Sequence, residues 1–191
     1  STIHDISGSI KALQQNQILD DIALFEIKAF AINIKKLNKD FTSPLFPMPD
    51  LQEVINILDP EKTESMQFYI YSAYSQELSQ IRKEFQQAKN EENEQKAHSL
   101  YVKSQQIENT IREQLGIKLF PYIPALLNAI KTIANIDLSF AKAKLSNHYN
   151  LQQVEITQER TLTYNSMFHP LVKEIKKKKK QTFQPINIEI K

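Results

Sequence analysis

Apolar residues recur at helical spacing along most of the chain. The first such stripe follows Asp20, a good helix N-cap, and it repeats every three or four residues. It consists of Ala23, Ile27, Phe30, Ile34, Leu37 and Phe41, with Lys28, Lys35, Lys36 and Lys39 expected around the other side. Prolines at 44, 47 and 49 end this helix, and a short second helix is expected over about residues 51–58. Residues 1–16 are predicted to be a mixed, turn-prone start.

Two narrower stripes in residues 75–119 predict a long helical arm. They consist of Leu78, Ile81, Phe85 and Ala88, from a Ser75 cap, and of Ala97, Leu100, Ser104, Ile107, Ile111 and Leu115. Between them, residues 89–96 (KNEENEQK) include no apolar side chain. This stretch is either the solvated tip of an antiparallel hairpin or the exposed middle of one helix of about 40 residues.

The last predicted helix covers 123–145, after a break or kink at Gly116, Pro121 and Pro124. It is apolar on most of its circumference, which predicts burial by neighbours on several sides, with Phe140 in the core. Asp137 within it is therefore expected to be a buried polar group that needs a hydrogen-bond donor.

Short strands are predicted where the apolar period changes to two. QFYIY (67–71) has strand-like content, residues 153–157 and 161–165 suggest a small hairpin around 158–160, and PINIEI (185–190) alternates. The expected fold is mainly α: a multi-helix core with a long antiparallel lever arm and short β-strands at the C-terminus. We expect a helical core and lever domain over 1–149, with the arm at about 75–119 and its tip at about 89–96, followed by a β segment over 150–191.

Composition narrows the classes of function. With glycine only at positions 8 and 116, no phosphate-binding glycine loop can be written in these 191 residues. The absence of cysteine excludes disulfides and thiolate zinc sites, and the scattered histidines predict no metal site. No long apolar run and no signal peptide are seen, so a cytoplasmic location without membrane insertion is expected. No grouping of nucleophiles, bases or paired acids argues for catalysis.

Positive charge is concentrated in one short segment. Lys173, Lys176, Lys177, Lys178, Lys179 and Lys180, with Glu174, give residues 173–180 a charge of +5, which leaves −3 for the rest of a chain whose net charge is +2. This lysine run can be a solvated loop between strands, a phosphate-contacting patch for DNA, or a tether to an anionic surface.

The C-terminal motifs resemble those of the MutS family of DNA mismatch-repair and recombination ATPases. They are IDLSFAKAKLS (136–146), FHPLV (168–172) and FQPINIEI (183–190), in family order. ILDP (57–60), FYI (68–70) and YSQELSQIR (74–82) look like the start of the outgoing lever helix, and IENTIREQL (107–115) like the returning one. Two departures are the short polar linker where many relatives insert a DNA clamp, and Ile186 where the family strand often has Asn.

The resemblance implies a core and lever module that ends before the phosphate loop of the ATPase domain. It places Phe183, Gln184 and Pro185 at the nucleotide-side edge, with His169 and Pro170 shaping the supporting strand. Phe168 and Phe183 can equally be core aromatics. It also implies ATP and Mg²⁺ as cofactors of the full-length parent, and none for this chain, which is not expected to be an enzyme. The partners would be the parent's own ATPase domain, a second copy in a homodimer of the full-length protein, and DNA held weakly, and no membrane partner is expected.

Two other classes of function stay open on the residues alone. The chain can be a non-enzymatic helical interaction protein whose arm is a partner-binding coiled coil. It can also be a weak nucleic-acid binder that uses the lysine run.

Overall fold

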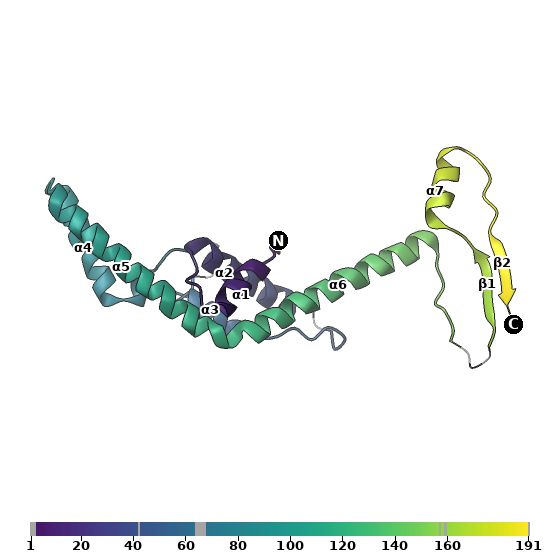
Figure 1. Ribbon diagram of the computed structural model, residues 1–191, viewed down its shortest axis with the longest axis horizontal. Coiled ribbons are helices and arrows are strands. Elements are labelled where there is room, and N and C mark those ends of the chain that lie inside the picture. The colour runs from purple at the N-terminus through teal and green to yellow at the C-terminus, as the bar shows by residue number, and fades with distance from the viewer. Residues whose placement is uncertain (1–2, 42, 64–67, 157, 159, 191) are drawn as a thin grey trace. The chain divides into compact units, whose positions relative to one another are not determined.

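The computed structural model describes residues 3–41, 43–63, 68–156, 158 and 160–190. Its elements in chain order are α1 (Ser7–Gln14), α2 (Asp21–Asp40), α3 (Gln52–Leu58), the short 3-10 helix η1 (Ser72–Tyr74), α4 (Gln76–Asn90), α5 (Glu94–Leu119), the 3-10 helix η2 (Phe120–Tyr122), α6 (Ile123–Tyr149), β1 (Leu162–Met167), α7 (Pro170–Lys178) and β2 (Ile186–Ile190) (Figure 1). The expected fold, mainly helical with short strands near the C-terminal end, is confirmed. The chain forms two compact units, a helical unit (Ser1–Ile136) and a C-terminal unit (Asp137–Lys191).

Helix α2 is the centre of the helical unit. Asp20 caps it as predicted, because its carboxylate accepts a hydrogen bond from the Ala23 amide at 2.8 Å. Burial is wider than the predicted stripe, and every residue from Ile27 to Ile34 is buried. The placement of Lys28 on the solvent side was therefore wrong.

Lys28 lies in the core because it has charged and polar partners there. Its Nζ is 3.2 Å from Asp59 Oδ1 and donates a hydrogen bond to the Tyr71 hydroxyl at 2.9 Å. Thr63 also donates a hydrogen bond to Asp59 Oδ1. The side chains of both Lys28 and Asp59 are almost fully withdrawn from solvent. Burying a charge is unfavourable unless it is paired, and here the pair connects α2 to the end of α3 and to the segment before η1.

Two local predictions in the helical unit need correction. Helix α1 occupies part of the segment expected to be turn-prone, and it buries Ile10 and Leu13. The strand predicted over 67–71 is absent from residues 68–71, while position 67 lies outside the described residues. That segment is irregular and packs its rings together instead, with Phe68 and Tyr71 in an edge-on contact at 5.8 Å.

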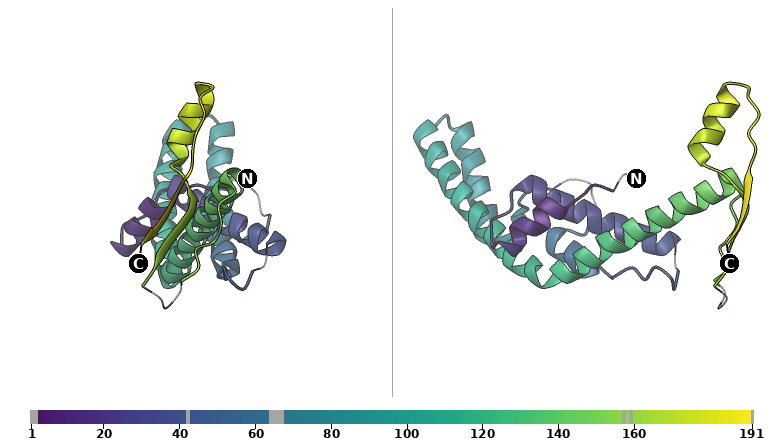
Figure 2. Two further views of the ribbon diagram at one scale, coloured as in Figure 1. Left: turned by 90° about the vertical axis from the view of Figure 1, so that its right-hand side faces the viewer. Right: turned by 45° about the vertical axis from the view of Figure 1, so that its right-hand side comes forward.

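The arm is a hairpin, the first of the two alternatives that the sequence left open. Helices α4 and α5 lie side by side and antiparallel in all views (Figures 1 and 2). Ser75 caps α4 as predicted, by accepting a hydrogen bond from the Leu78 amide. The turn between them places Glu92 in the left-handed region, with φ of 54°, and Asn93 then caps α5. Across the pair, the Phe85 and Tyr101 rings lie 6.3 Å apart.

Only a short 3-10 segment interrupts the helical path from α5 to α6. Gly116 stays within α5, and the helix changes character only at η2, which contains Pro121. In the helical unit the first turns of α6 bury Ile123, Leu126, Ala129 and Thr132.

The expectation that α6 is buried on several sides to its end was wrong. Phe140 is 64% exposed, and Leu138 and Leu145 are also exposed. Asp137 is exposed as well, so it is not the buried polar group that we predicted. An apolar circumference predicts burial only where neighbouring elements exist to cover it.

In the C-terminal unit, β1 pairs with β2 in an antiparallel two-stranded sheet. Leu162 faces Ile190 and Tyr164 faces Ile188, with an irregularity before Met167. The predicted hairpin of 153–157 with 161–165 is therefore wrong for the described residues, since 153–156 form no strand and position 157 lies outside them. The lysine run is also not simply a loop between strands, because residues up to Lys178 belong to α7.

The buried ion pair gives a stability prediction. Lys28→Met removes one partner and leaves Asp59 buried without its cation, so the free energy of unfolding should fall by about 3 to 5 kcal/mol. Lys36→Met on the exposed side of the same helix is the matched control and should change it by about 0.5 kcal/mol or less. Urea unfolding followed by circular dichroism measures both, and equal effects would contradict the assignment.

Tyr74 gives a pH prediction. Its hydroxyl donates a hydrogen bond to the Ile57 carbonyl at 3.0 Å. Burial raises the pKa of Tyr74 above its ordinary value of 10.0, and electrostatic repulsion from Tyr71 and Asp59 raises that pKa further. The folded state keeps this phenol neutral where the unfolded chain ionises it, so stability is lost as the pH rises above about 10.

Tyr74→Phe should accordingly be less stable than the wild type at pH 8, by about 1 kcal/mol for the lost hydrogen bond. This difference in the free energy of unfolding should become smaller as the pH rises beyond 10, because only the wild type has the Tyr74 hydroxyl and loses stability as that group ionises in the unfolded chain. Urea unfolding at a series of pH values measures this difference. A difference that stays constant or widens over that range would show that the Tyr74 pKa is not raised by folding.

Candidate functional site: the ion-pair network at the base of the arm

Two polar residues lie within the buried side of α5. Ser104 and Glu108 are both 8% exposed, although their neighbours on that side, Ile111 and Leu115, are apolar. Positions 104, 108, 111 and 115 are spaced by four, three and four residues and so share one face of the helix. A carboxylate on such a face needs charged or hydrogen-bonding partners.

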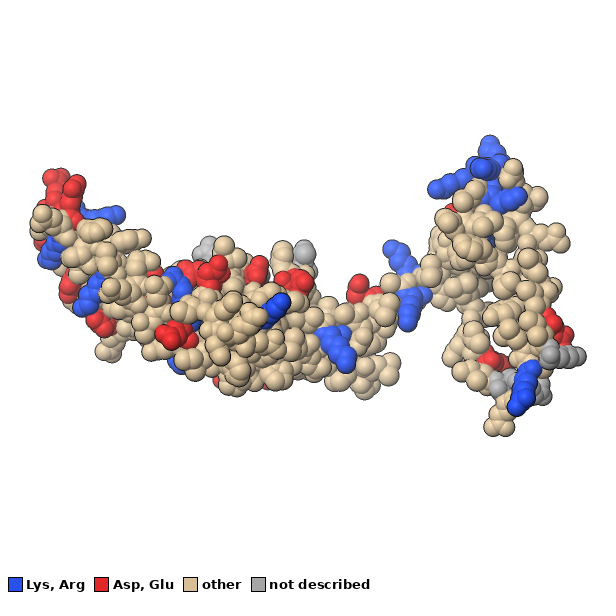
Figure 3. Space-filling model, viewed as in Figure 1, with Lys and Arg blue, Asp and Glu red and all other residues tan. Residues whose placement is uncertain are grey.

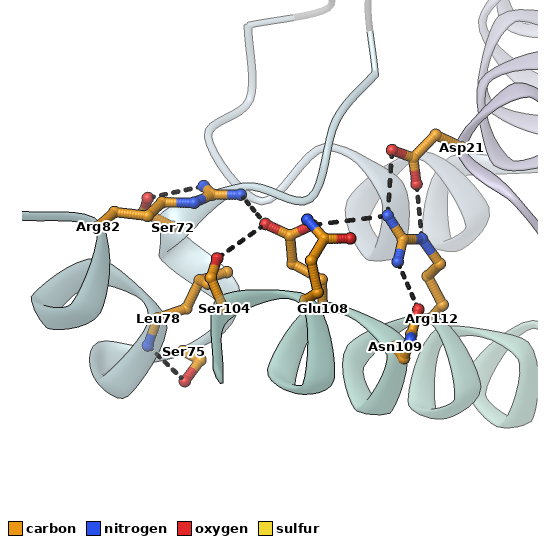
Figure 4. Close-up of polar contacts among 10 residues, drawn as sticks. Asp21, Ser72, Ser75, Leu78, Arg82, Ser104, Glu108, Asn109 and Arg112 are labelled. Carbon is orange, nitrogen blue, oxygen red and sulfur yellow. Dashed lines mark hydrogen bonds and ion pairs between the residues drawn. The ribbon is translucent and has the colours of Figure 1, made fainter. Parts of the chain in front are cut away.

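The Glu108 carboxylate has such partners on α4 and on α5 itself (Figure 4). Its Oε1 accepts hydrogen bonds from Arg82 of α4 at 2.8 Å and from the Ser104 hydroxyl at 3.3 Å. Its Oε2 accepts one from Gln105 at 3.2 Å and lies 3.6 Å from the Arg112 guanidinium. The carboxylate therefore connects the two arm helices close to their base.

Arg112 extends the network from the arm to the core. Its Nε and Nη2 donate to the two carboxylate oxygens of Asp21 at 2.8 and 3.3 Å, and its Nη1 donates to Asn109. Asp21 is the first residue of α2, where the helix dipole favours a negative charge. Hydrogen bonding to Asp21 raises the pKa of Arg112, so the guanidinium stays charged in alkaline solution.

The four charges alternate in sign from α4 to α2. Arg82, whose other nitrogen donates to Ser72 at 3.0 Å, is followed by Glu108, Arg112 and Asp21 (Figure 4). Two-point arginine contacts fix orientation as well as distance. The network therefore holds the arm at one position against the N-terminus of α2.

The polar atoms of the network are engaged with one another. Glu108 already accepts hydrogen bonds on both oxygens, so it is poorly placed to act as a general base. No group of three or more potential metal ligands occurs among the described residues.

The residues predicted from the C-terminal motifs lie in the other unit, and only some of them meet. The rings of Phe168 and Phe183 are edge-on at 6.4 Å, and Lys173 Nζ lies 4.1 Å from the centre of the Phe168 ring. Tyr149, at the end of α6, is 6.0 Å from Phe168. Phe168 and Phe183 are half-buried here, which matches the interpretation of them as packing aromatics.

The other predicted residues form no common site with this cluster. His169 is the N-cap residue of α7 without a side-chain capping bond, and Pro170 is the first residue of that helix. Gln184 and Pro185 are exposed before β2. Lys176, Lys177 and Lys178 form the last turn of α7, and Lys179 and Lys180 follow it.

Sequence reasoning does not single out the network residues, because the apolar stripe is the stronger local signal. Ser104 lies within the predicted stripe, and Glu108 is four residues further on. A carboxylate at a buried helical position is itself a signal that a cation must be near. Its partners Arg82 and Arg112 could have been proposed from the same reasoning, but Asp21 is 91 residues from Arg112.

Comparison with known proteins gives no relative: no family model, curated protein or solved structure matches the chain. Within the described ranges, no helix combines the length and the apolar character needed to cross a bilayer.

A double-mutant cycle tests the joint between arm and core. Arg112→Gln, Asp21→Asn and the double variant should show a coupling of about 1 kcal/mol in the free energy of unfolding, because the arginine is mostly buried although Asp21 is partly exposed.

The Lys103–Glu77 pair is the matched control, with a 3.2 Å separation and both side chains more than half exposed. Its cycle should give a coupling of about 0 to 0.5 kcal/mol. Equal couplings in the two cycles would mean that the Arg112 bridge is an ordinary surface pair.

Proposed function

We propose that this chain is the core and lever module of a MutS-like DNA-repair ATPase, and that it transmits nucleotide state to the arm. The observation that carries the proposal is the arm joint, in which Arg112 ties α5 to the first residue of α2. The motif resemblance in the sequence points to the same class of protein.

A lever must be stiff along its length and fixed at its base. Helix α5 has 26 residues, so it is about 39 Å long. Helix α4 packs along it and buries Leu78, Ile81 and Ala88, and the Arg82–Glu108 bridge joins the two helices. A pair of helices joined in this way supports movement as one body.

The place where such a lever could change angle is η2. Short 3-10 segments between α-helices often mark hinges, and Phe120–Tyr122 contains Pro121, which lacks a backbone donor. α6 begins directly after it at Ile123 and continues into the C-terminal unit. In this proposal, a movement driven by nucleotide is transmitted through α6 and turns the arm at η2.

The sheet of the C-terminal unit would adjoin the ATPase domain of the parent. Its strands expose Leu162, Tyr164, Met167, Ile186 and Ile190, although a two-stranded sheet alone is marginally stable in water. A covering domain would bury these side chains. In this proposal Phe183, Gln184 and Pro185 lie at the nucleotide-side edge, and ATP with Mg²⁺ binds the parent rather than this chain.

We also propose that the isolated chain does not hydrolyse ATP, that the parent acts in the cytoplasm and can form a homodimer, and that this chain contacts DNA only weakly. The acidic side chains at the arm tip support the last point, since they repel phosphates (Figure 3).

The gene gives the first test. The codons that follow Lys191 should encode a G-x-x-x-x-G-K-[ST] loop within about 30 residues. A continuous reading frame without such a loop would contradict the proposal.

Amide hydrogen exchange on the full-length protein gives the second test. Replacing ADP by a non-hydrolysable ATP analogue should change protection by severalfold at residues 117–125, around η2, and leave the α4–α5 contact residues unchanged. The arm itself serves as the internal control. Loss of protection throughout α4 and α5 would mean that the arm melts rather than turns.

A helical interaction protein is the second candidate function. Tyr101 and Val102 are exposed side chains on α5 and offer a contact surface for a partner. This function predicts that Tyr101→Ala with Val102→Ala abolishes partner capture while nucleotide has no effect on the arm.

A further inference from the structure

Helix α7 is held to its unit by its polar side. Glu174 Oε1 lies 3.6 Å from His148 Nε2 at the end of α6, and Lys173 covers the Phe168 ring. Pro170, Lys173 and Glu174 are all half-buried. With 3.6 residues per turn these three positions share one side of the helix, which is the side that contacts the rest of the unit.

The apolar side of α7 points away from that contact. Leu171, Val172 and Ile175 share the opposite side of the helix and are 63%, 41% and 43% exposed. An amphipathic helix in a globular unit normally buries this side and exposes the polar one. In α7 the arrangement is reversed, so the apolar side is available to something outside the unit.

Lysines border that apolar side. The half-buried Lys176 and the exposed Lys178 flank it on the helical surface, and Lys179 and Lys180 follow at the C-terminal end, whereas Lys177 lies on the same side as Lys173. Figure 3 shows the blue side chains gathered over this helix. The surface therefore offers three apolar side chains flanked by two lysines, with two more lysines beyond the end of the helix.

We propose that α7 is a peripheral membrane-binding helix, which lays its apolar side into the headgroup region of an anionic bilayer. Leu171, Val172 and Ile175 would enter the interface, while the flanking lysines extend their ammonium groups to lipid phosphates and carboxylates. Each lysine near an anionic surface strengthens binding by about fivefold. The positive charge thus identifies the occupant of the apolar side as anionic lipid.

Nucleic acid fits the same charge less well. Phosphates of a duplex would bind the lysines but leave the three apolar side chains in water, since a sugar-phosphate surface has no apolar layer to receive them. A lipid interface accommodates both kinds of side chain at once. This inference is independent of the proposed lever function, which needs neither Leu171 nor Ile175.

Vesicle co-sedimentation of the whole chain tests the proposal. Binding is compared on vesicles of phosphatidylcholine alone and with 30% phosphatidylserine, and on a 30-base-pair DNA duplex. We expect binding to the anionic vesicles only, a loss of at least tenfold with Leu171→Gln plus Ile175→Gln, and a loss of about 100-fold with Lys176→Gln, Lys178→Gln and Lys179→Gln.

Matched controls come from the helical unit. Ile22→Gln with Ile117→Gln changes two exposed apolar side chains, and Lys11→Gln with Lys36→Gln and Lys39→Gln changes three exposed lysines. Neither control should alter vesicle binding by more than about twofold, apart from the general effect of charge at low salt. Circular dichroism confirms that each variant keeps its helix content.

A tryptophan reporter decides whether the apolar side enters lipid. The chain has no tryptophan, so Leu171→Trp gives a single signal. Its emission should shift to shorter wavelength with anionic vesicles and be quenched by brominated lipid. The proposal is overturned if the emission does not move, if vesicle binding survives Leu171→Gln with Ile175→Gln, or if only DNA is bound and only the lysines matter.

Discussion

The buried pair of Lys28 and Asp59 is the constraint on which the helical unit depends. Two opposite charges with almost no access to solvent must stay together, because separating them would remove the charge that each one faces in the core. The pair joins the middle of α2 to the end of α3, and Tyr71 adds the segment that leads into the arm. Four residues later Ser75 caps α4, so the position of the arm's first helix follows from a contact within the core.

The polar network at the base of the arm also fixes the positions of helices, but nearer the surface. Apolar contacts between helices favour association but tolerate sliding, whereas charge pairs at fixed positions select one register. Arg82 and Glu108 select the register between α4 and α5, and Arg112 with Asp21 selects the position of α5 against α2. The buried pair and the network together turn two helices into an arm with a defined base, which is what the proposed lever requires.

The sequence predicts those features of the structure that are determined by residues close together in the chain. The caps at Asp20 and Ser75 and the two arm stripes are set by residues within a few positions, and all appear in the structure. The strand pairing was missed because β1 finds its partner beyond α7, outside the range of any local pattern. Lys28 was placed in solvent because its partner Asp59 is 31 residues away. Phe140 was expected in the core but is exposed, because hydrophobicity alone does not show whether another element covers the side chain.

Without nucleotide the arm should have a single position on the core, and a distance measurement between the two tests this. The chain has no cysteine, so spin labels can be placed at Glu92→Cys in the arm tip and Lys36→Cys on α2, both exposed. We expect one narrow distance distribution by double electron–electron resonance in the absence of nucleotide, and a broader one when Arg112→Gln is added. A distribution that is already broad without that substitution, or one that Arg112→Gln leaves unchanged, would contradict this expectation.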